Sequence, residues 1–499
     1  MARLSAVAAP FDDARRVKYG TTVEITVTLA WGDDAMAMTS NRGNREYIGF
    51  LCNESSYFAP PPFSICMKHD EFSPLHASES VEASDQTLPV PDLSGLIRPG
   101  DTVMWGQSHA EPVTLMRALV AQRDRLRRLR LFLGIGLADV LAPEHADAFD
   151  FLAYCGSGAN RKLARAGVLD ILPAHYSQLP ALIGSGALRI DVVMLQVSPP
   201  DEQGRYSLGL AREYLVEALK HARAIIAEVH PEVPWTYGGP WLQASDIDLL
   251  VASDTPFADS PASAPGEVEL AIGRHVASLV EDGATLQTGI GAIPDAVLAQ
   301  LRDRRDLGVH TGSIGDGVAA LCEAGVVTNA RKTIDAGVTV GGVIIGSERI
   351  RRFAHRNAAL ELRGTEYTHN PKVLGRIARF VAINSAVEVD LTGQVNAEMV
   401  AGTYVGAVGG VGDFLRAAQS SPGGVPIVAL PSTASVHSRI VTRVSGPVTV
   451  PRSDACVIVT EYGVADLRGL SLAQRVLRMI AVAHPAHRER LEQEARMNR

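Results

Sequence analysis

The sequence lacks long apolar runs and has few aromatic residues. No stretch approaches the ~18 consecutive apolar residues that a membrane-spanning helix needs, and the opening segment MARLSAVAAPFDDARR has no apolar signal core. Both observations predict a cytoplasmic protein that does not bind membranes. Aromatic residues make up only 5% of the chain and glycine occurs 45 times, which favours a loop-rich α/β enzyme over a β-sandwich.

Cysteine is also scarce, and its spacing is uninformative. The five cysteines are widely scattered, at Cys52, Cys66, Cys155, Cys322 and Cys456. None forms a C-x-x-C pair, so the sequence predicts neither a zinc site nor a disulfide framework. We expect isolated, reduced thiols, as in other cytoplasmic proteins.

A large excess of either charge is missing as well. Lys and Arg number 47 and Asp and Glu number 55, which gives a net charge of −8. Such a chain has no overall electrostatic attraction to nucleic acid or anionic lipid. The hydrophobic share of 46% and the charged share of 20% are ordinary for globular proteins.

The chain divides into three predicted parts. Residues 1–88 form an N-terminal extension of unknown role, with a strand pattern at Thr21–Trp31 and a polar, turn-rich linker at His76–Val90. Residues 89–262 are predicted to form one α/β domain and residues 263–499 a second.

Short apolar runs alternate with helical patterns from about residue 90 onward. Strands are predicted at Thr102–Trp105, Leu129–Leu133, Val192–Gln196, Ala224–Glu228 and the end of Glu281–Thr288. Helical patterns predict helices at Pro112–Leu119 and at Pro294–Leu301. The proline that begins each of them is compatible with a first helical turn. This alternation predicts mostly parallel sheets.

Two motifs occur twice in the same order. PGDTVMWG…EPVTLMRAL in the first half is matched by EDGATLQTG…IPDAVLAQL in the second, and DEQGRY is matched by DLTGQV. The interval from Gly106 to Gly204 nearly equals that from Gly289 to Gly393. We interpret this as an internal duplication, which predicts two similar α/β halves facing each other across a ligand-binding cleft.

Two glycine-rich segments and one carboxylate are the candidate site residues. The first segment would let a ligand approach the backbone beside a helix N-terminus. It comprises Gly289, Ile290, Gly291, Ala292 and Ile293. The second contains Gly406, Gly409 and Gly410 and could present backbone N–H groups to an oxyanion. Glu461 follows an apolar strand, where a carboxylate would face the cleft. Plain turns, and an ion pair between Glu461 and Arg468, are the structural alternatives.

Several long segments resemble the acetyl-CoA hydrolase/transferase family, which includes 4-hydroxybutyrate CoA-transferases and belongs to the class I CoA-transferases. The resemblance covers about residues 90–495. It is carried by LQTGIGAIPDAVLAQL, DLGVHTGSIGDGVAALCEAGVVTN, INSAVEVDLTGQVNAEMV, VGGVGDFLRAA, IVALPSTA, SRIV and IVTEYGVADLRGLSLAQR.

This resemblance implies two CoA-transferase-type domains and ping-pong chemistry. A family glutamate attacks an acyl-CoA and then carries CoA as a thioester to a small carboxylic acid. CoA is a co-substrate, no cofactor is permanently bound, no metal is required, and a homodimer is expected. The family's pattern would place Gly289–Ile293 and Gly409 along CoA, Gly406 and Gly410 beside the thioester, and Glu461 in the active-site cleft.

The sequence departs from the family at the reacting centre. The family segment H-[ST]-E-x-x-x-D-G reads HTGSIGDG here, so Gly312 stands where the nucleophilic Glu belongs. His369 replaces an Asn of the family's N-H-P turn, and Ser435 replaces a Lys that follows P-S-T-A. Because these losses fall within one predicted site, they indicate altered chemistry or lost activity.

Three functional interpretations remain open. The chain is a CoA-transferase-family protein acting on acyl-CoA thioesters, an acyl-CoA hydrolase or non-covalent acyl transferase, or a silent CoA-thioester-binding subunit. Asp316, four positions beyond Gly312, could supply a carboxylate, although it matches an Asp already present in the family. Ser313 paired with His310 or His369 is the other candidate nucleophile.

Overall fold

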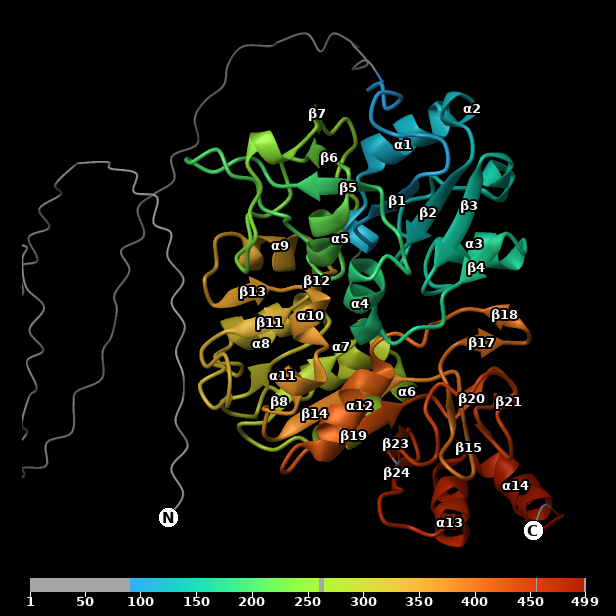
Figure 1. Cartoon of the computed structure of the whole chain (residues 1–499). Coiled ribbons are helices and arrows are strands. Elements are labelled where there is room, and N and C mark those ends of the chain that lie inside the picture. The colour runs from blue at the N-terminus through green and yellow to red at the C-terminus, as the bar shows by residue number, and fades with distance from the viewer. Residues whose placement is uncertain (1–89, 260–263, 455, 498–499) are drawn as a thin grey trace, which may run out of the picture. The chain divides into compact units, whose positions relative to one another are not determined.

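The computed structural model describes residues 90–259, 264–454 and 456–497 (Figure 1). The predicted N-terminal extension, with its strand at Thr21–Trp31, lies outside the described residues. Among the residues described, no helix is both long enough and apolar enough to cross a membrane.

The first half contains a parallel sheet with the order β4-β3-β2-β1-β5-β6-β7. Its strands are β1 (Thr102–Trp105), β2 (Leu129–Leu133), β3 (Phe149–Ala153), β4 (Leu169–Ile171), β5 (Val192–Val197), β6 (Ala224–Val229) and β7 (Leu249–Ala252). The helices of this half are α1 (Val113–Ala121), α2 (Arg123–Leu126), α3 (Asn160–Arg165), α4 (Leu179–Gly184) and α5 (Leu215–His221). Every residue of β1 and β5 is buried, as expected for central parallel strands covered on both faces.

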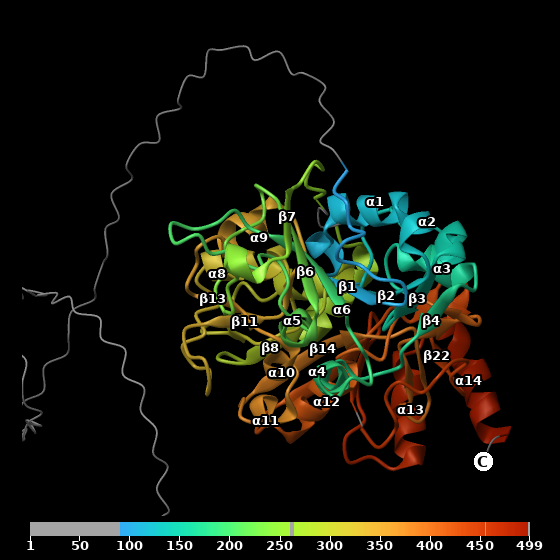
Figure 2. The same ribbon diagram turned by 45° about the horizontal axis from the view of Figure 1, so that its top comes forward.

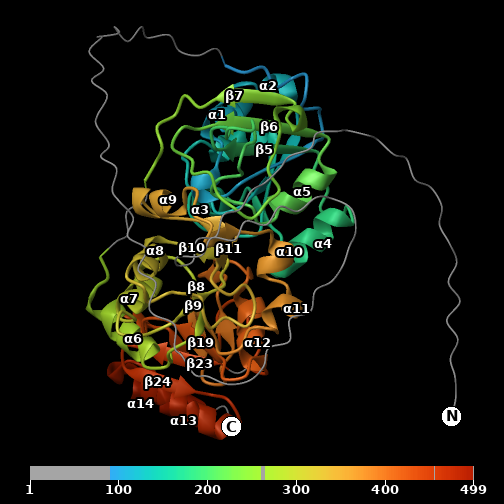
Figure 3. The same ribbon diagram turned by 90° about the vertical axis from the view of Figure 1, so that its left-hand side faces the viewer.

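The second half contains a sheet with the order β24-β23-β19-β14-β8-β9, in which only β23 and β24 pair in antiparallel fashion. Its strands are β8 (Thr285–Thr288), β9 (Gly308–Val309), β14 (Phe380–Ser385), β19 (Val425–Ala429), β23 (Val457–Thr460) and β24 (Gly463–Asp466). Helices α6 (Glu267–Ala277) and α7 (Ala292–Ala299) cover one face, and α12 (Val411–Ser420) covers the other (Figure 3).

Shorter elements connect and extend these two sheets. The other helices are α8 (Asp316–Glu323), α9 (Glu348–Ala354), α10 (Thr365–Thr368), α11 (Pro371–Leu374), α13 (Leu472–Val482) and α14 (Pro485–Met497). Small strand pairs and a triplet are β10 (Ser313–Ile314) with β12 (Val343–Ile344), β11 (Thr339–Gly341) with β13 (Leu360–Leu362), β15 (Glu388–Asp390) with β16 (Val395–Asn396) and β22 (Ile440–Val441), β17 (Met399–Val400) with β18 (Thr403–Tyr404), and β20 (Thr433–Ala434) with β21 (His437–Ser438). Helices α13 and α14 lie side by side at the C-terminal end (Figure 2).

The two halves repeat one plan, which confirms the predicted fold of two similar α/β domains. In the first sheet the chain runs outward from β1 to β4 and then returns to the other side of β1 with β5. In the second sheet it runs from β8 to β9 and returns to the other side of β8 with β14. Each sheet therefore has a topological switch point, where ligands bind in open α/β sheets. These points lie between β1 and β5 and between β8 and β14.

The predicted start of one helix was wrong. The sequence pattern placed a helix at Pro294–Leu301, whereas α7 spans Ala292–Ala299 with Gly291 as its N-cap. Pro294 falls within the first turn, where its missing N–H has no intrahelical acceptor to lose. Gly291 has φ of 109°, a left-handed value that favours glycine at this entry to the helix.

Candidate functional site

A cavity of about 170 Å³ lies between the two halves; we call it the interdomain cavity. From the first half it is lined by Gln107, Ile135, Tyr154, Tyr176 and Glu213. From the second half it is lined by Gln287, Thr288, Gly289, Ile290, Gly312, Ser313, Val343, Ile345, His369, Asn384, Gly409, Gly410, Val411 and Phe414. Because β8 and β14 both contribute residues, the cavity lies at the switch point of the second sheet.

The second glycine-rich segment joins the halves at this cavity. The Gly156 N–H donates to the Gly406 carbonyl at 3.0 Å, and the Tyr176 N–H donates to the Gly409 carbonyl at 2.9 Å. A Cβ at Gly406 would lie 2.0 Å from the Ala397 carbonyl oxygen, so only glycine fits there. Backbone of the second half is thereby fixed against the first half, and α12 begins immediately after this loop.

Gly312 and His369, two of the sequence departures, meet in the interdomain cavity. A Cβ at Gly312 would lie 3.2 Å from both Cε1 and Nε2 of His369. A Cβ at Gly410 would lie 2.7 Å from the same Nε2. The imidazole edge therefore fills the space between these glycines, where a longer side chain at position 312 would otherwise extend.

His369 is a neutral imidazole packed against two aromatic rings. Burial lowers its pKa to about 3, and the neighbouring His310 adds to the effect. Its ring lies 4.8 Å from the Tyr176 ring and 4.6 Å from the Phe414 ring, measured between centroids.

The hydrogen-bond network indicates which nitrogen of His369 carries the proton. The Thr368 hydroxyl lies 2.9 Å from Nδ1 and 3.3 Å from the Gly364 carbonyl. That carbonyl already accepts the N–H groups of Tyr367 and Thr368, both at 3.0 Å. We therefore assign the hydroxyl as a donor to Nδ1, which leaves an N–H at Nε2 facing the cavity.

Glu213, which the sequence analysis missed, places a carboxylate in this cavity. Its side chain accepts from Gln107 Nε2, at 2.8 and 2.7 Å to the two oxygens, and from the Tyr176 hydroxyl at 2.9 Å. The Gln107 amide is itself oriented, because its oxygen accepts from the Tyr154 hydroxyl at 2.6 Å and from the Ile135 N–H at 3.0 Å. The carboxylate is thus held by a buried network whose members line the same cavity.

Two physical features mark Glu213 as unusual. Burial raises the pKa of its carboxyl to about 7, against the opposing effect of the Tyr176 and Gln107 hydrogen bonds. Its φ is 33°, a strained value for a residue other than glycine, and such strain concentrates at functional sites. Perturbed carboxyl groups in clefts are likewise candidate functional groups.

Glu213 lies close to Gly312. An added Cβ at Gly342 would lie 3.0 Å from the Gly312 carbonyl oxygen and 3.1 Å from Glu213 Cγ. Both atoms therefore lie near Gly342, which precedes the cavity-lining Val343. No sequence signal distinguishes Glu213, because AREYLVEAL is an ordinary amphipathic helix start in which a glutamate is unremarkable.

The first glycine-rich segment is divided between cavity and helix. Gly289 and Ile290 line the interdomain cavity. Gly291 caps α7, and Ala292 and Ile293 form its first turn. These last three are not among the described residues that line the cavity.

Asp316 and Glu461 also lie outside the described lining of this cavity. Asp316 accepts from the Ser347 N–H and hydroxyl, both at 2.9 Å, and from the Ile350 N–H at 3.1 Å, so it holds the start of α9. Glu461 accepts from the Ser432 N–H at 2.8 Å and from its hydroxyl at 2.5 Å. Arg468 pairs with Asp466 at 2.7 Å, where the sequence had suggested Glu461 as its partner.

His310, another candidate base, lies outside the described lining of the interdomain cavity. His310 is fully buried, its Nε2 lies 3.1 Å from the Thr368 carbonyl, and burial lowers its pKa to about 3. Ser313 lines the cavity. In the part of the chain described, no group of three or more His, Cys, Asp or Glu side chains is arranged to hold a metal ion.

Comparison with known proteins identifies the family. Residues 89–258 match the acetyl-CoA hydrolase/transferase N-terminal domain, and residues 346–495 match the C-terminal domain of that family. The chain belongs to the acetyl-CoA hydrolase/transferase family. The 4-hydroxybutyrate coenzyme A transferase of Clostridium kluyveri is 38% identical over 398 residues, which cover 79% of this chain and 93% of that protein.

Solved structures of similar proteins share this fold. RipA from Yersinia pestis superposes with a TM-score of 0.77 at 34% identity, covering 81% of this chain and 95% of RipA. A 4-hydroxybutyrate CoA-transferase from Porphyromonas gingivalis superposes with a TM-score of 0.70 at 34% identity, covering 82% of this chain and 96% of that one. The family resemblance seen in the sequence is therefore confirmed.

Proposed function

We propose that this protein hydrolyses acyl-CoA thioesters in the interdomain cavity, without a glutamyl intermediate at position 312. The observation that carries this proposal is the position of the buried Glu213 carboxyl. It lines the same cavity as Gly312, the residue at the family's nucleophile position. A carboxyl with a pKa of about 7 is suited to accept a proton from water at neutral pH.

Backbone and imidazole donors would hold the thioester. Val411 is the first residue of α12, and the N–H groups of a first helical turn have no acceptor within the helix. Gly410 and Val411 line the cavity beside the Nε2–H of His369, so donors from two elements would converge on a thioester oxygen. The pantetheine arm would pass Gly289 and Ile290, and the small cavity favours a short acyl group.

The reaction would proceed in two balanced steps. Glu213 accepts a proton from water as the water oxygen forms a bond to the thioester carbon. The oxyanion that results faces the N–H donors of α12 and His369, which stabilise it. When that oxyanion collapses, the carbon–sulfur bond breaks and the thiolate of CoA takes the proton from Glu213. The products are the free carboxylic acid and CoA, and Glu213 returns to its ionised form.

His369 is the weaker candidate for the base. Its pKa of about 3 makes it a poor proton acceptor at neutral pH, whereas the pKa of Glu213 lies near the working pH. A neutral imidazole with an N–H toward the cavity is instead suited to donate to an oxyanion. We therefore assign proton transfer to Glu213 and oxyanion binding to His369.

The rate of CoA release is expected to depend on pH through Glu213. The ionised carboxylate is the active form, so kcat/KM should be level above about pH 7 and fall roughly tenfold per pH unit below it. The measurement is CoA release from acetyl-CoA and butyryl-CoA with a thiol reagent, from pH 5 to pH 9, without an acceptor acid. A rate that stays level down to pH 5 would exclude Glu213 as the base.

The same assay distinguishes the alternative functions. CoA release that requires an added carboxylic acid would show CoA transfer, and acyl-CoA binding without turnover would show a silent subunit.

A further inference from the structure

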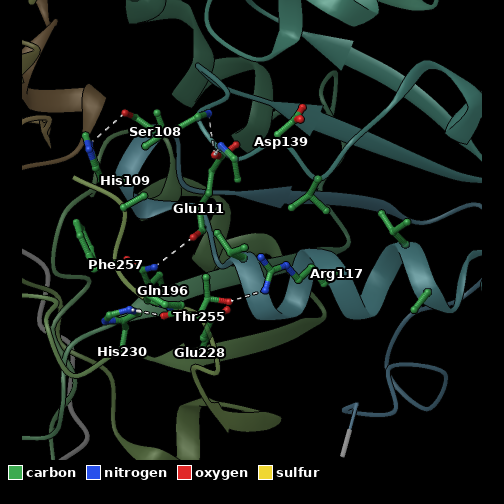
Figure 4. A pocket seen from close by; sticks show the side chains of 18 residues that line it. Ser108, His109, Glu111, Arg117, Asp139, Gln196, Glu228, His230, Thr255 and Phe257 are labelled. Atoms are coloured by element: carbon green, nitrogen blue, oxygen red, sulfur yellow. Dashed lines mark hydrogen bonds between the residues drawn. The ribbon is translucent and has the colours of Figure 1, made fainter. Parts of the chain in front are cut away.

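A second, larger cavity of about 630 Å³ lies in the first half (Figure 4); we call it the first-half cavity. Ser108 and His109 follow β1, Gln196 belongs to β5 and Glu228 to β6, and all four line it. The cavity therefore lies at the switch point of the first sheet, as the interdomain cavity lies at that of the second. Its volume falls within the range of small-molecule sites.

The walls are largely apolar, but two buried polar atoms lack a partner. Val113, Val120, Leu137 and Phe257 are among the apolar lining residues. Among the described residues, neither His109 Nε2 nor Gln196 Oε1 has a hydrogen-bond partner. Both side chains are more than nine-tenths buried, at 6% and 7% exposed. Leaving such atoms unsatisfied is costly, and a ligand with donor groups would satisfy them.

Gln196 is held so that its oxygen remains an acceptor. Its Nε2 donates to the backbone carbonyl of Glu111 at 3.2 Å. His109 stacks on Phe257 with a centroid distance of 5.9 Å and an interplanar angle of 7° (Figure 4). Burial lowers the pKa of His109 to about 4, so its ring is neutral and contributes no positive charge.

The charged side chains around this cavity favour a cation. The lining holds three carboxylates, Glu111, Asp139 and Glu228, and one guanidinium, Arg117. Asp139 pairs with Lys162, and Glu228 accepts the Thr114 N–H at 2.9 Å and the Leu115 N–H at 3.2 Å.

Like Glu228, Glu111 is a lining carboxylate that has no ion-pair partner among the described residues. One of its oxygens accepts the N–H groups of Leu137 and Ala138, at 2.8 and 2.7 Å. No ion pair to Glu111 occurs among the described residues. Burial raises the pKa of this carboxyl to about 7, which is the expected result of leaving an acid in an apolar site without a cation.

We propose that the first-half cavity binds a small organic cation, a primary amine on an apolar body. The ammonium group would donate to Gln196 Oε1 and to the Glu111 carboxylate, and the apolar body would lie against the α1 side chains Val113 and Val120. A carboxylate ligand would instead face the acidic lining. This site is separate from the interdomain cavity and does not depend on the proposed hydrolase activity.

The test is isothermal titration of the full chain at pH 7 with hexylamine, hexanol and hexanoate, which share one apolar chain. Hexylamine is expected to bind most tightly and hexanoate most weakly. Amine binding should also release protons, because the ammonium favours the ionised form of Glu111. The release is measured by repeating the titration in buffers of different ionisation enthalpy, since the observed heat then changes with the buffer. Hexanoate binding as tightly as hexylamine, or no binding by any of the three, would overturn the proposal.

Two variants assign the binding to this cavity. Glu111→Gln should weaken hexylamine by about 10- to 100-fold and abolish the proton release, while leaving hexanol within about twofold. Glu213→Gln, a buried carboxyl variant of the other cavity, should leave hexylamine binding unchanged. If Glu111→Gln fails to fold, Gln196→Met is the second test, because it should weaken the binding of both hexylamine and hexanol. Unchanged amine affinity in the folded variant would place the binding site elsewhere and contradict the proposal.

Discussion

Glu213→Gln is expected to lower kcat for CoA release by about 100- to 10,000-fold, the usual range for loss of a general base. The amide keeps the shape of the carboxyl, and its oxygen can still accept from Gln107 and Tyr176, which now hold the carboxylate. KM should change little, because the donors expected to hold the thioester lie on α12 and at His369. The measurement is steady-state CoA release at pH 8, where the wild-type carboxyl is ionised.

A matched control separates this effect from a general cost of altering a buried glutamate. Glu111 is also buried with a pKa near 7, but it lines the first-half cavity. Glu111→Gln should therefore retain kcat within about twofold. Glu213→Asp should retain part of the rate and its fall below neutral pH. Full activity of folded Glu213→Gln, or equal losses in both Gln variants, would remove Glu213 from the mechanism.

The double variant Gly312→Glu/His369→Asn is expected to transfer CoA faster than the combined effects of the two single variants predict. Gly312→Glu places a glutamate where we predict the family's nucleophile to lie, but its Cβ alone would lie 3.2 Å from His369. The imidazole must therefore move, or be replaced by a smaller side chain, before the new carboxylate can approach a thioester. His369→Asn restores the family's residue there and provides the space.

A double-mutant cycle measures this dependence. The assay follows CoA transfer from butyryl-CoA to acetate in wild type, both single variants and the double variant. We expect a favourable coupling of about 0.5–3 kcal/mol, the range for residues in direct contact. The double variant should also form a CoA adduct that hydroxylamine removes. Additive effects, or no transfer by a folded double variant, would contradict the placement of positions 312 and 369 at the reacting centre.

The fold was readable from the sequence because its central strands are buried on both faces. Strands such as Thr102–Trp105 and Leu129–Leu133 are short apolar runs bounded by turns, and the structure places β1 and β2 at those residues. The repeated motifs around Gly106 and Gly289 follow β1 and β8, the corresponding strands of the two sheets. The start of α7 was placed too late because proline at its first turn resembles a helix boundary.

The candidate site was readable only in part. Gly289, Gly312 and Gly410 were predicted as site positions, because glycine-rich turns and departures from the family pattern are visible in the sequence, and the structure brings them to one cavity. Glu213 and Gln107 could not be found this way. They lie far apart in the chain, and only the folding of the first half, which brings the loop after β1 beside the start of α5, places them in contact. A buried carboxylate of this kind has no local sequence signature.

The most direct test of the account is a single turnover of butyryl-CoA with excess enzyme in ¹⁸O-labelled water, followed by mass spectrometry of the acid and the intact protein. Direct attack by water predicts one labelled oxygen in the butyric acid, free CoA, and a protein that carries neither label nor adduct. Label in the peptide that contains Glu213, or an acyl or CoA adduct on the wild-type chain, would show that a side chain of the enzyme attacks the thioester, contrary to this account.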